Sequence, residues 1–172
     1  MPNDFVVNVV VAGVGGQGVI KAADILAEAA FRAGCDVKQS EIHGMSQRGG
    51  SVTSDVRFGA CVLSPMVPEG SADFLLVLEP TQVENNLGGL RAGGETISPS
   101  ALLGEETTVK QLDSGDRAPL SSRNFNVAML GVLSRRLEIP ETAWLEAIRA
   151  NLPRKVWDEN ETVFGMGRAV QG

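Results

Sequence analysis

The fold of this chain is decided by residues Val6–Gly34, which read VVNVVVAGVGGQGVIKAADILAEAAFRAG. The stretch opens with a nearly unbroken run of valines, which is typical of a strand covered by helices on both faces. Apolar side chains then recur at helical spacing from Val19 to Arg32, and Gly34 is a natural stop for a helix. The stretch therefore predicts a strand, a tight turn and a helix.

The turn between strand and helix is rich in glycine. Gly13, Gly15 and Gly18 occupy the positions of a G-x-G-x-x-G pattern, and Gly16 and Gln17 lie inside it. In such a pattern the absent side chains permit a sharp turn, close approach of a ligand to the backbone and close packing of helix on strand. Two interpretations stay open. The turn either only reverses the chain after a buried strand, or it binds an anion with the N–H groups at the helix start.

A dinucleotide site would be one form of the second interpretation. A possible second strand, Asp36–Ser40, is followed by Glu41, near the spacing at which an acidic residue holds a ribose hydroxyl. Lys38 and Gln39, however, make this strand too polar for the central position that a dinucleotide-binding sheet normally gives it.

Composition narrows the class of protein. With 172 residues and 43% hydrophobic content, residues 1–172 are expected to form a single domain with a sizeable core. The net charge of −6 gives no electrostatic footprint for nucleic acid or for an anionic membrane. Neither a basic leader nor an apolar run of the roughly 20 residues needed to cross a bilayer is present, so a cytoplasmic protein is expected.

The two cysteines, Cys35 and Cys61, are far apart in the sequence and have no C-x-x-C partner. We expect both to be buried small hydrophobic residues in a reducing compartment. Two cysteines cannot ligate an iron–sulfur cluster of the usual four-cysteine kind within one chain.

The chemically richest stretch is Ser40–Gly50, which has no apolar period and is expected to be an exposed functional loop. His43 is the only histidine of the chain, and a lone histidine is more often structural than catalytic. Arg48 precedes Gly49 and Gly50, and a guanidinium beside a pliable backbone suits a phosphate or carboxylate. The alternative is a solvated surface arginine.

Further strands are predicted beyond this loop. Val52–Phe58 alternates as a strand buried on one face, and residues 59–60 then turn into Cys61–Leu63, a hairpin that makes the sheet mixed. Phe74–Leu78 is a second central strand, and because ligands in open α/β sheets bind at the carboxyl ends of such strands, Glu79 and the glycine turn are expected to share the ligand edge.

The remaining elements are mostly helical. Short strands are predicted at residues 96–97 and 107–112, and helices at residues 81–90, 126–137, 140–152 and 160–168. The fold class is therefore α/β, a three-layer α/β/α Rossmann-like domain with a mixed, mostly parallel sheet and one β-hairpin. No Ser–His–Asp set, H-E-x-x-H, P-loop or paired His/Cys ligand spacing occurs in the sequence.

The combination of motifs is more specific than any one of them. The glycine turn, the Ser40–Val52 stretch SEIHGMSQRGGSV and the later Leu78-Glu79-Pro80 together resemble the gamma-type subunits of 2-oxoacid:ferredoxin oxidoreductases. The resemblance is closest to the beta subunits of indolepyruvate ferredoxin oxidoreductases. It extends into the C-terminal half, where Asn126 and Met129-Leu130-Gly131 follow in the expected order.

That resemblance implies a division of labour. In such complexes a 2-oxoacid is decarboxylated on thiamine diphosphate, electrons leave through iron–sulfur clusters to ferredoxin, and the acyl group passes to coenzyme A. The resemblance places thiamine diphosphate and the clusters in a large partner subunit and gives this chain no catalytic residue, no metal and no cofactor of its own. It implies that the turn and the loop line the interface near the partner's thiamine site through Gly13, Gly15, Gly16, Gln17, Gly18, His43, Ser46, Gln47, Arg48, Gly49 and Gly50.

Two rival functions stay open at this point. One is a free-standing NAD-type dinucleotide-binding domain, although the length leaves little chain for a substrate domain. The other is a pure assembly protein whose glycine turn binds nothing.

Overall fold

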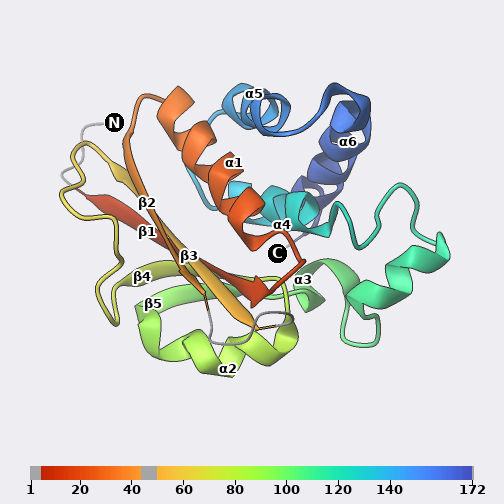
Figure 1. The fold of residues 1–172 in the computed structure, drawn as a ribbon, viewed down its shortest axis with the longest axis horizontal. Helices are drawn as coiled ribbons and strands as arrows, with labels where there is room; N and C mark the ends of the chain where they lie inside the picture. The colour runs from red at the N-terminus through yellow and green to blue at the C-terminus, as the bar shows by residue number, and fades with distance from the viewer. Residues whose placement is uncertain (1–4, 44–49, 172) are drawn as a thin grey trace.

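The computed structural model describes residues 5–43 and 50–171 (Figure 1). Its strands are β1 (Val6–Val14), β2 (Asp36–His43), β3 (Ser51–Gly59), β4 (Ala72–Val77) and β5 (Leu90–Ile97). Its α-helices are α1 (Val19–Arg32), α2 (Val83–Asn86), α3 (Ser100–Leu103), α4 (Phe125–Ser134), α5 (Glu141–Asn151) and α6 (Trp157–Arg168). Short 3₁₀ turns lie at η1 (Pro80–Gln82), η2 (Leu87–Gly89), η3 (Val109–Ser114) and η4 (Arg154–Val156).

The sheet is mixed, as the sequence predicts. Its strand order is β2-β3-β1-β4-β5, in which β1, β4 and β5 pair in parallel and β3 runs antiparallel to both β1 and β2. β1 is therefore the central strand. The polar strand predicted at Asp36–Ser40 is β2, and it lies at the edge of the sheet, where its polarity causes no cost.

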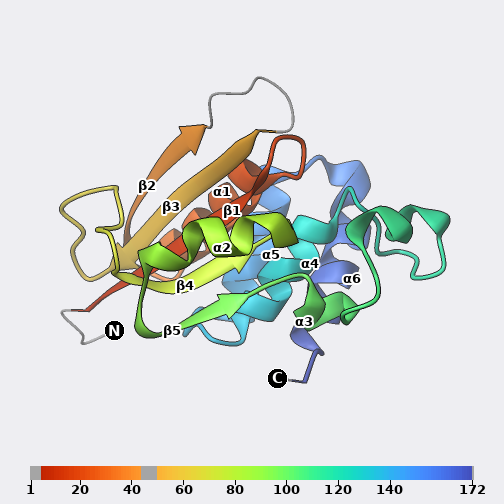
Figure 2. The same ribbon diagram turned by 90° about the horizontal axis from the view of Figure 1, so that it is seen from below.

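Helices cover both faces of the sheet. Figure 1 shows α1, α4, α5 and α6 on one side, and Figure 2, from below, shows α2 crossing the other side. The helical side holds the larger core, which includes Val9 and Val11 of β1 and Leu26 of α1. The α2 side holds a small cluster around Ala12, Leu75 and Val77. The three-layer α/β/α arrangement predicted from the sequence is thus present, with very unequal layers.

Three local predictions are wrong. The strand before β3, which is β2, pairs with it as a hairpin, whereas Cys61–Leu63 forms no strand and the N–H of Val62 bonds the Asp36 carboxylate at 2.7 Å. Residues 107–112, predicted as a strand, lie around η3, where Gln111 and Thr108 form a capping box. Cys61 is exposed and Cys35 only half-buried, so neither is the buried residue expected.

The helical predictions hold. The structure contains α4, α5 and α6 at the helices predicted for residues 126–137, 140–152 and 160–168. Pro140 is the N-cap of α5, in agreement with the proline expected at the start of that helix. α1 ends as expected, because the N–H groups of Gly34 and Cys35 bond back to Phe31 and Ala30 in the pattern of a Schellman motif. No helix among the described residues is both long and apolar enough to span a bilayer.

α4 and α6 touch backbone to backbone. A Cβ atom added to Gly167 would overlap the carbonyl oxygen of Ala128, and one added to Gly131 would overlap that of Phe164. Gly165, on the same helix α6, has open space around it. Close packing therefore depends on two glycines, one from each helix.

Replacing Gly167 by Ala should lower the free energy of unfolding by about 2 kcal/mol or more, because backbone atoms cannot move aside as a flexible side chain can. Gly165→Ala is the matched control and should be neutral or stabilising by up to about 1 kcal/mol, since Ala is the better helix former. Urea unfolding of both variants makes the comparison. Equal effects at the two positions would contradict the close contact.

The segment from Ala60 to Ser71, called here the outer loop, lies against the sheet face opposite α1 and is held by polar bonds. Arg57 of β3 donates to the carbonyls of Ser64 and Met66 at 2.8 and 3.2 Å. The carboxylate of Asp55, only 8% exposed, accepts from the N–H of Val67 at 2.8 Å. Burial raises the pKa of Asp55, while the Val67 bond and the charge of Arg57 act to lower it.

This raised pKa predicts a pH-dependent stability. The contribution of Asp55 is fully present below the pKa of an unfolded Asp and is lost as pH rises through the raised, folded pKa. Asp55→Asn keeps an acceptor for Val67 and cannot ionise, so its free energy of unfolding relative to wild type should increase between about pH 3 and pH 7.

Asp113→Asn is the control with the opposite sign. Bonds from Ser122 lower the pKa of exposed Asp113, so its contribution is present above the unfolded pKa and lost as pH falls through the folded pKa. Urea unfolding over the pH series should give slopes of opposite sign for the two variants, and parallel slopes would refute the assignment.

Candidate functional site

The glycine turn joins the carboxyl end of β1 to the N-terminus of α1. The N–H of Gln17 bonds the carbonyl of Val14 at 3.2 Å, which closes a four-residue turn with Gly15 and Gly16 at its centre. Gly16 has φ of 88°, as the third residue of a type II turn requires, and no other residue takes up this conformation as readily. Gly15 and Gly16 are exposed, so the tip of the turn presents main chain to its surroundings.

The outer glycines of the pattern serve packing. A Cβ on Gly13 would lie 2.7 Å from Cγ2 of Val19 and 2.8 Å from Oε1 of Gln17. Gly18 is the N-cap of α1, with φ of 77°, and a side chain there would overlap the amide of Asn126. Part of the glycine pattern is therefore explained by close packing of helix on strand, which is one of the three properties expected of the absent side chains in such a pattern.

Gln17 binds its own turn and the neighbouring strand end. Its Oε1 accepts from the N–H of Val14 at 2.9 Å, and its Nε2 donates to Oε2 of Glu79 at 3.0 Å. Because β1 and β4 are parallel, their carboxyl ends meet here, and Glu79 lies beside the turn as the sequence predicts. Both ends of the Gln17 amide are thus engaged within the chain.

Asn126, near the N-terminus of α4, binds the glycine turn at Gly18. It is 6% exposed, and its Nδ2 donates to the carbonyl of Gly18 at 3.1 Å across 108 residues of sequence. The sequence singled out Asn126 only through the family resemblance. No periodic or spacing signal could have placed it here, because the contact depends on how α4 packs against α1.

The end of the Ser40–Gly50 stretch meets the same turn. The N–H of Gly15 donates to the carbonyl of Gly50 at 2.9 Å, so the two segments predicted to share a site are hydrogen-bonded to each other. His43 is the last residue of β2, opposite Val52, and its side chain is not described. The predicted residues Ser46, Gln47, Arg48 and Gly49 lie outside the described part of the chain.

The dinucleotide interpretation is not supported by the topology. β3 lies between β1 and β2, so Glu41 pairs with Ser54 and is separated from the glycine turn's own strand by a whole strand. Adjacent strands are about 4.8 Å apart, so this places Glu41 about two strand spacings from β1. In a dinucleotide site the acidic residue ends the strand next to β1.

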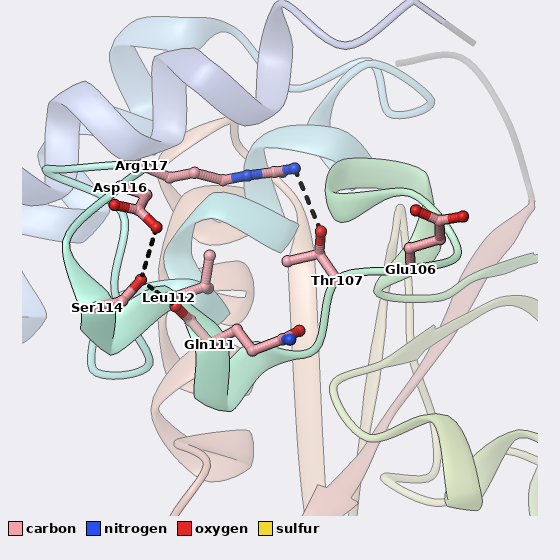
Figure 3. A pocket seen from close by; sticks show the side chains of 7 residues that line it. All are labelled: Glu106, Thr107, Gln111, Leu112, Ser114, Asp116 and Arg117. Atoms are coloured by element: carbon pink, nitrogen blue, oxygen red, sulfur yellow. Dashed lines mark hydrogen bonds between the residues drawn. The ribbon is translucent and has the colours of Figure 1, made fainter.

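A cavity of about 420 Å³ lies elsewhere and is lined by the segment that connects α3 to α4. Figure 3 shows Arg117 reaching across it toward Thr107, whose Oγ1 is 3.4 Å from Nη2, a long and weak bond. Its lining contains Glu106, Thr107, Gln111, Leu112, Ser114, Asp116 and Arg117, none of them a predicted site residue. Within the described residues no group of three or more His, Cys, Asp or Glu side chains could hold a metal ion.

The fold and the meeting of turn and loop define the class of protein. Residues 8–170 match the model of the pyruvate ferredoxin/flavodoxin oxidoreductase family, and the chain belongs to that family.

Particular relatives agree. The chain is 36% identical over 188 residues to the indolepyruvate oxidoreductase subunit IorB of Thermococcus kodakarensis, with 93% of each chain covered. It is 32% identical to the common gamma subunit of the pyruvate/ketoisovalerate oxidoreductases of Thermococcus litoralis, over 79% of this chain and 72% of that one. The keto/oxoacid ferredoxin oxidoreductase gamma subunit of Geobacter sulfurreducens superposes with a TM-score of 0.74 at 25% identity, covering 94% and 95% of the two chains.

Asn126→Ala should lower the free energy of unfolding by about 1–2 kcal/mol, because it removes a bond from a buried side chain to the carbonyl of Gly18. Asn151→Ala is the control, since its Nδ2 bonds a carbonyl only four residues back, at the end of α5. We expect the control to cost less than half as much in chemical denaturation. A reversed order would mean that Asn126 does not support the turn.

Proposed function

We propose that this chain is the small subunit of a 2-oxoacid:ferredoxin oxidoreductase and that its glycine turn, together with Gly50, lines the active-site interface with a large partner. The partner would carry thiamine diphosphate, on which the 2-oxoacid is decarboxylated, and the iron–sulfur clusters that pass electrons to ferredoxin. Coenzyme A would accept the acyl group. The bond between Gly15 and Gly50 carries the proposal, because it joins two of the segments on which the family resemblance rests.

The chemistry of the turn fits such a role. Its exposed tip consists of Gly15 and Gly16, which have no side chain that could obstruct a neighbouring cofactor, and the N–H of Gly15 is already bonded to Gly50. Main-chain N–H groups at a helix start favour anionic groups such as phosphates and carboxylates. We propose that the predicted residues His43, Ser46, Gln47, Arg48 and Gly49 contribute to the same interface, with Arg48 as the principal donor to an anion.

The class of substrate follows from the same comparison. Both curated relatives are named for the 2-oxoacids of their complexes. The indolepyruvate oxidoreductase subunit is more similar to this chain than the pyruvate/ketoisovalerate oxidoreductase subunit is. We therefore propose an aromatic 2-oxoacid as the first substrate to test, with pyruvate as the second.

The outer loop offers a surface for the partner. Leu63 and Met66 of this loop are 91% and 55% exposed, and Ile42 of the adjoining strand β2 is 50% exposed. The Ser40 hydroxyl donates to the carbonyl of Pro65, and the Asp55 carboxylate accepts from the N–H of Val67, so the apolar side chains are presented from a fixed position. This face adjoins the end of β2 that leads into the predicted functional loop.

Activity should depend on the partner. The purified chain alone should not reduce ferredoxin or viologen with any 2-oxoacid, whereas adding it to the large subunit should restore turnover. In hydrogen exchange of the assembled complex, the outer loop and the end of β2 should become protected, while η3 (Val109–Ser114) should not change.

Two results would contradict this proposal. Reduction of viologen by the chain alone would give it an electron carrier of its own. If the complex shows full turnover while hydrogen exchange of the outer loop and of the glycine turn is as fast as in the free chain, the partner binds another face.

A further inference from the structure

We propose that Glu79 is a positioning residue that acts through Gln17 to hold the glycine turn in one conformation. The proposal rests on the function proposed above, in which the turn faces the active-site interface. It assigns to Gln17, predicted from the sequence as a ligand-binding residue, a different role: its amide braces the main chain that binds.

The bracing consists of the two hydrogen bonds of the Gln17 side chain, to Val14 and to Glu79, and these two bonds together are called here the brace. Oε1 of Gln17 accepts from Val14 at 2.9 Å, which ties the end of the turn to its beginning, and Nε2 donates to Glu79 at 3.0 Å, which ties the turn to β4. Glu79 is itself well anchored, because the N–H of Leu78, the residue before it, bonds the carbonyl of Ala12 at 2.8 Å. The Glu79 carboxylate thus fixes the turn relative to the sheet.

A glycine-rich turn needs such a brace. Gly15 and Gly16 lack the side chains that would restrict their backbone angles, so the free turn would occupy many conformations. A donor that is fixed before a ligand arrives binds more effectively than one that must be ordered on binding. Asn126 fixes the carbonyl of Gly18 at the other end of the turn, which leaves the Gln17 side as the part that depends on Glu79.

The contact also makes a specific exchange possible. In the double variant Gln17→Glu with Glu79→Gln, the new carboxylate at position 17 can accept from both Val14 and the new amide at position 79, so both bonds are kept and the net charge is unchanged. Gln17→Met removes both bonds at nearly constant shape. Gln17→Glu alone places two carboxylates against each other.

The experiment uses two measurements. Amide exchange of Val14 in the isolated chain reports the brace without any partner, and we expect it to be about tenfold faster in Gln17→Met, in line with one lost hydrogen bond. In the complex reassembled with the large subunit, KM and kcat are measured separately for coenzyme A and for the 2-oxoacid. Gln17→Met and Gln17→Glu should each lower kcat/KM by about tenfold.

The double variant should recover both the slow exchange and most of the lost kcat/KM. Gln39→Met, which removes a similar amide bond to Asp24 at the sheet edge, is the control and should alter neither measurement. A merely structural role would lower the stability of both Gln variants alike and leave kinetic constants per assembled complex unchanged.

Three outcomes would overturn the proposal. Unchanged exchange of Val14 in Gln17→Met would mean that the brace is not formed. Recovery of exchange without recovery of turnover in the double variant would mean that the Glu79 carboxylate itself contacts a reactant. Faster exchange of Val14 in Gln17→Met with unchanged kinetic constants would mean that the position of the turn does not matter for function. The wider proposal of a partner-dependent subunit is decided separately, by the reassembly experiment.

Discussion

The site depends on the place of β1 in the sheet. β1 pairs antiparallel with β3 on one side and parallel with β4 on the other, so its carboxyl end lies where β3 begins and where β4 ends. Gly50 precedes β3 and Glu79 follows β4, and both contact the glycine turn for that reason. If β1 lay at an edge of the sheet, the turn would have a neighbour on one side only.

Packing far from the turn fixes its other end. α4 can carry Asn126 to Gly18 because α4 packs beside α1, and α6 packs on α4 through the backbone contact at Gly131 and Gly167. A side chain at either glycine would push the two helices apart, and the change would be transmitted along α4 toward Gly18. The C-terminal helices therefore contribute to the geometry of a turn formed near the start of the chain.

The sequence predicts local elements well and their partners poorly. The strand, turn and helix of Val6–Gly34 follow from periodicity and from glycine positions, which are properties of neighbouring residues. The pairing of β3 with β2 was missed because it joins residues far apart in sequence, up to Asp36 opposite Gly59, which no local pattern reports. Asn126 lay beyond local patterns for the same reason, and the order β2-β3-β1, which removes the dinucleotide interpretation, is a property of the whole sheet.

The two ends of the glycine turn are held by hydrogen bonds of different character, one from Asn126 and one to Glu79. The Asn126 side chain is buried and its bond to the Gly18 carbonyl joins two uncharged groups, whereas Gln17 and Glu79 are half-buried and their bond ends on a carboxylate. Exclusion of water by a partner would strengthen the Gln17–Glu79 contact more than the Asn126 contact, because hydrogen bonds to a carboxylate gain most when the surroundings become less polar. The turn would then be most rigid in the assembled complex, where its main-chain groups are needed.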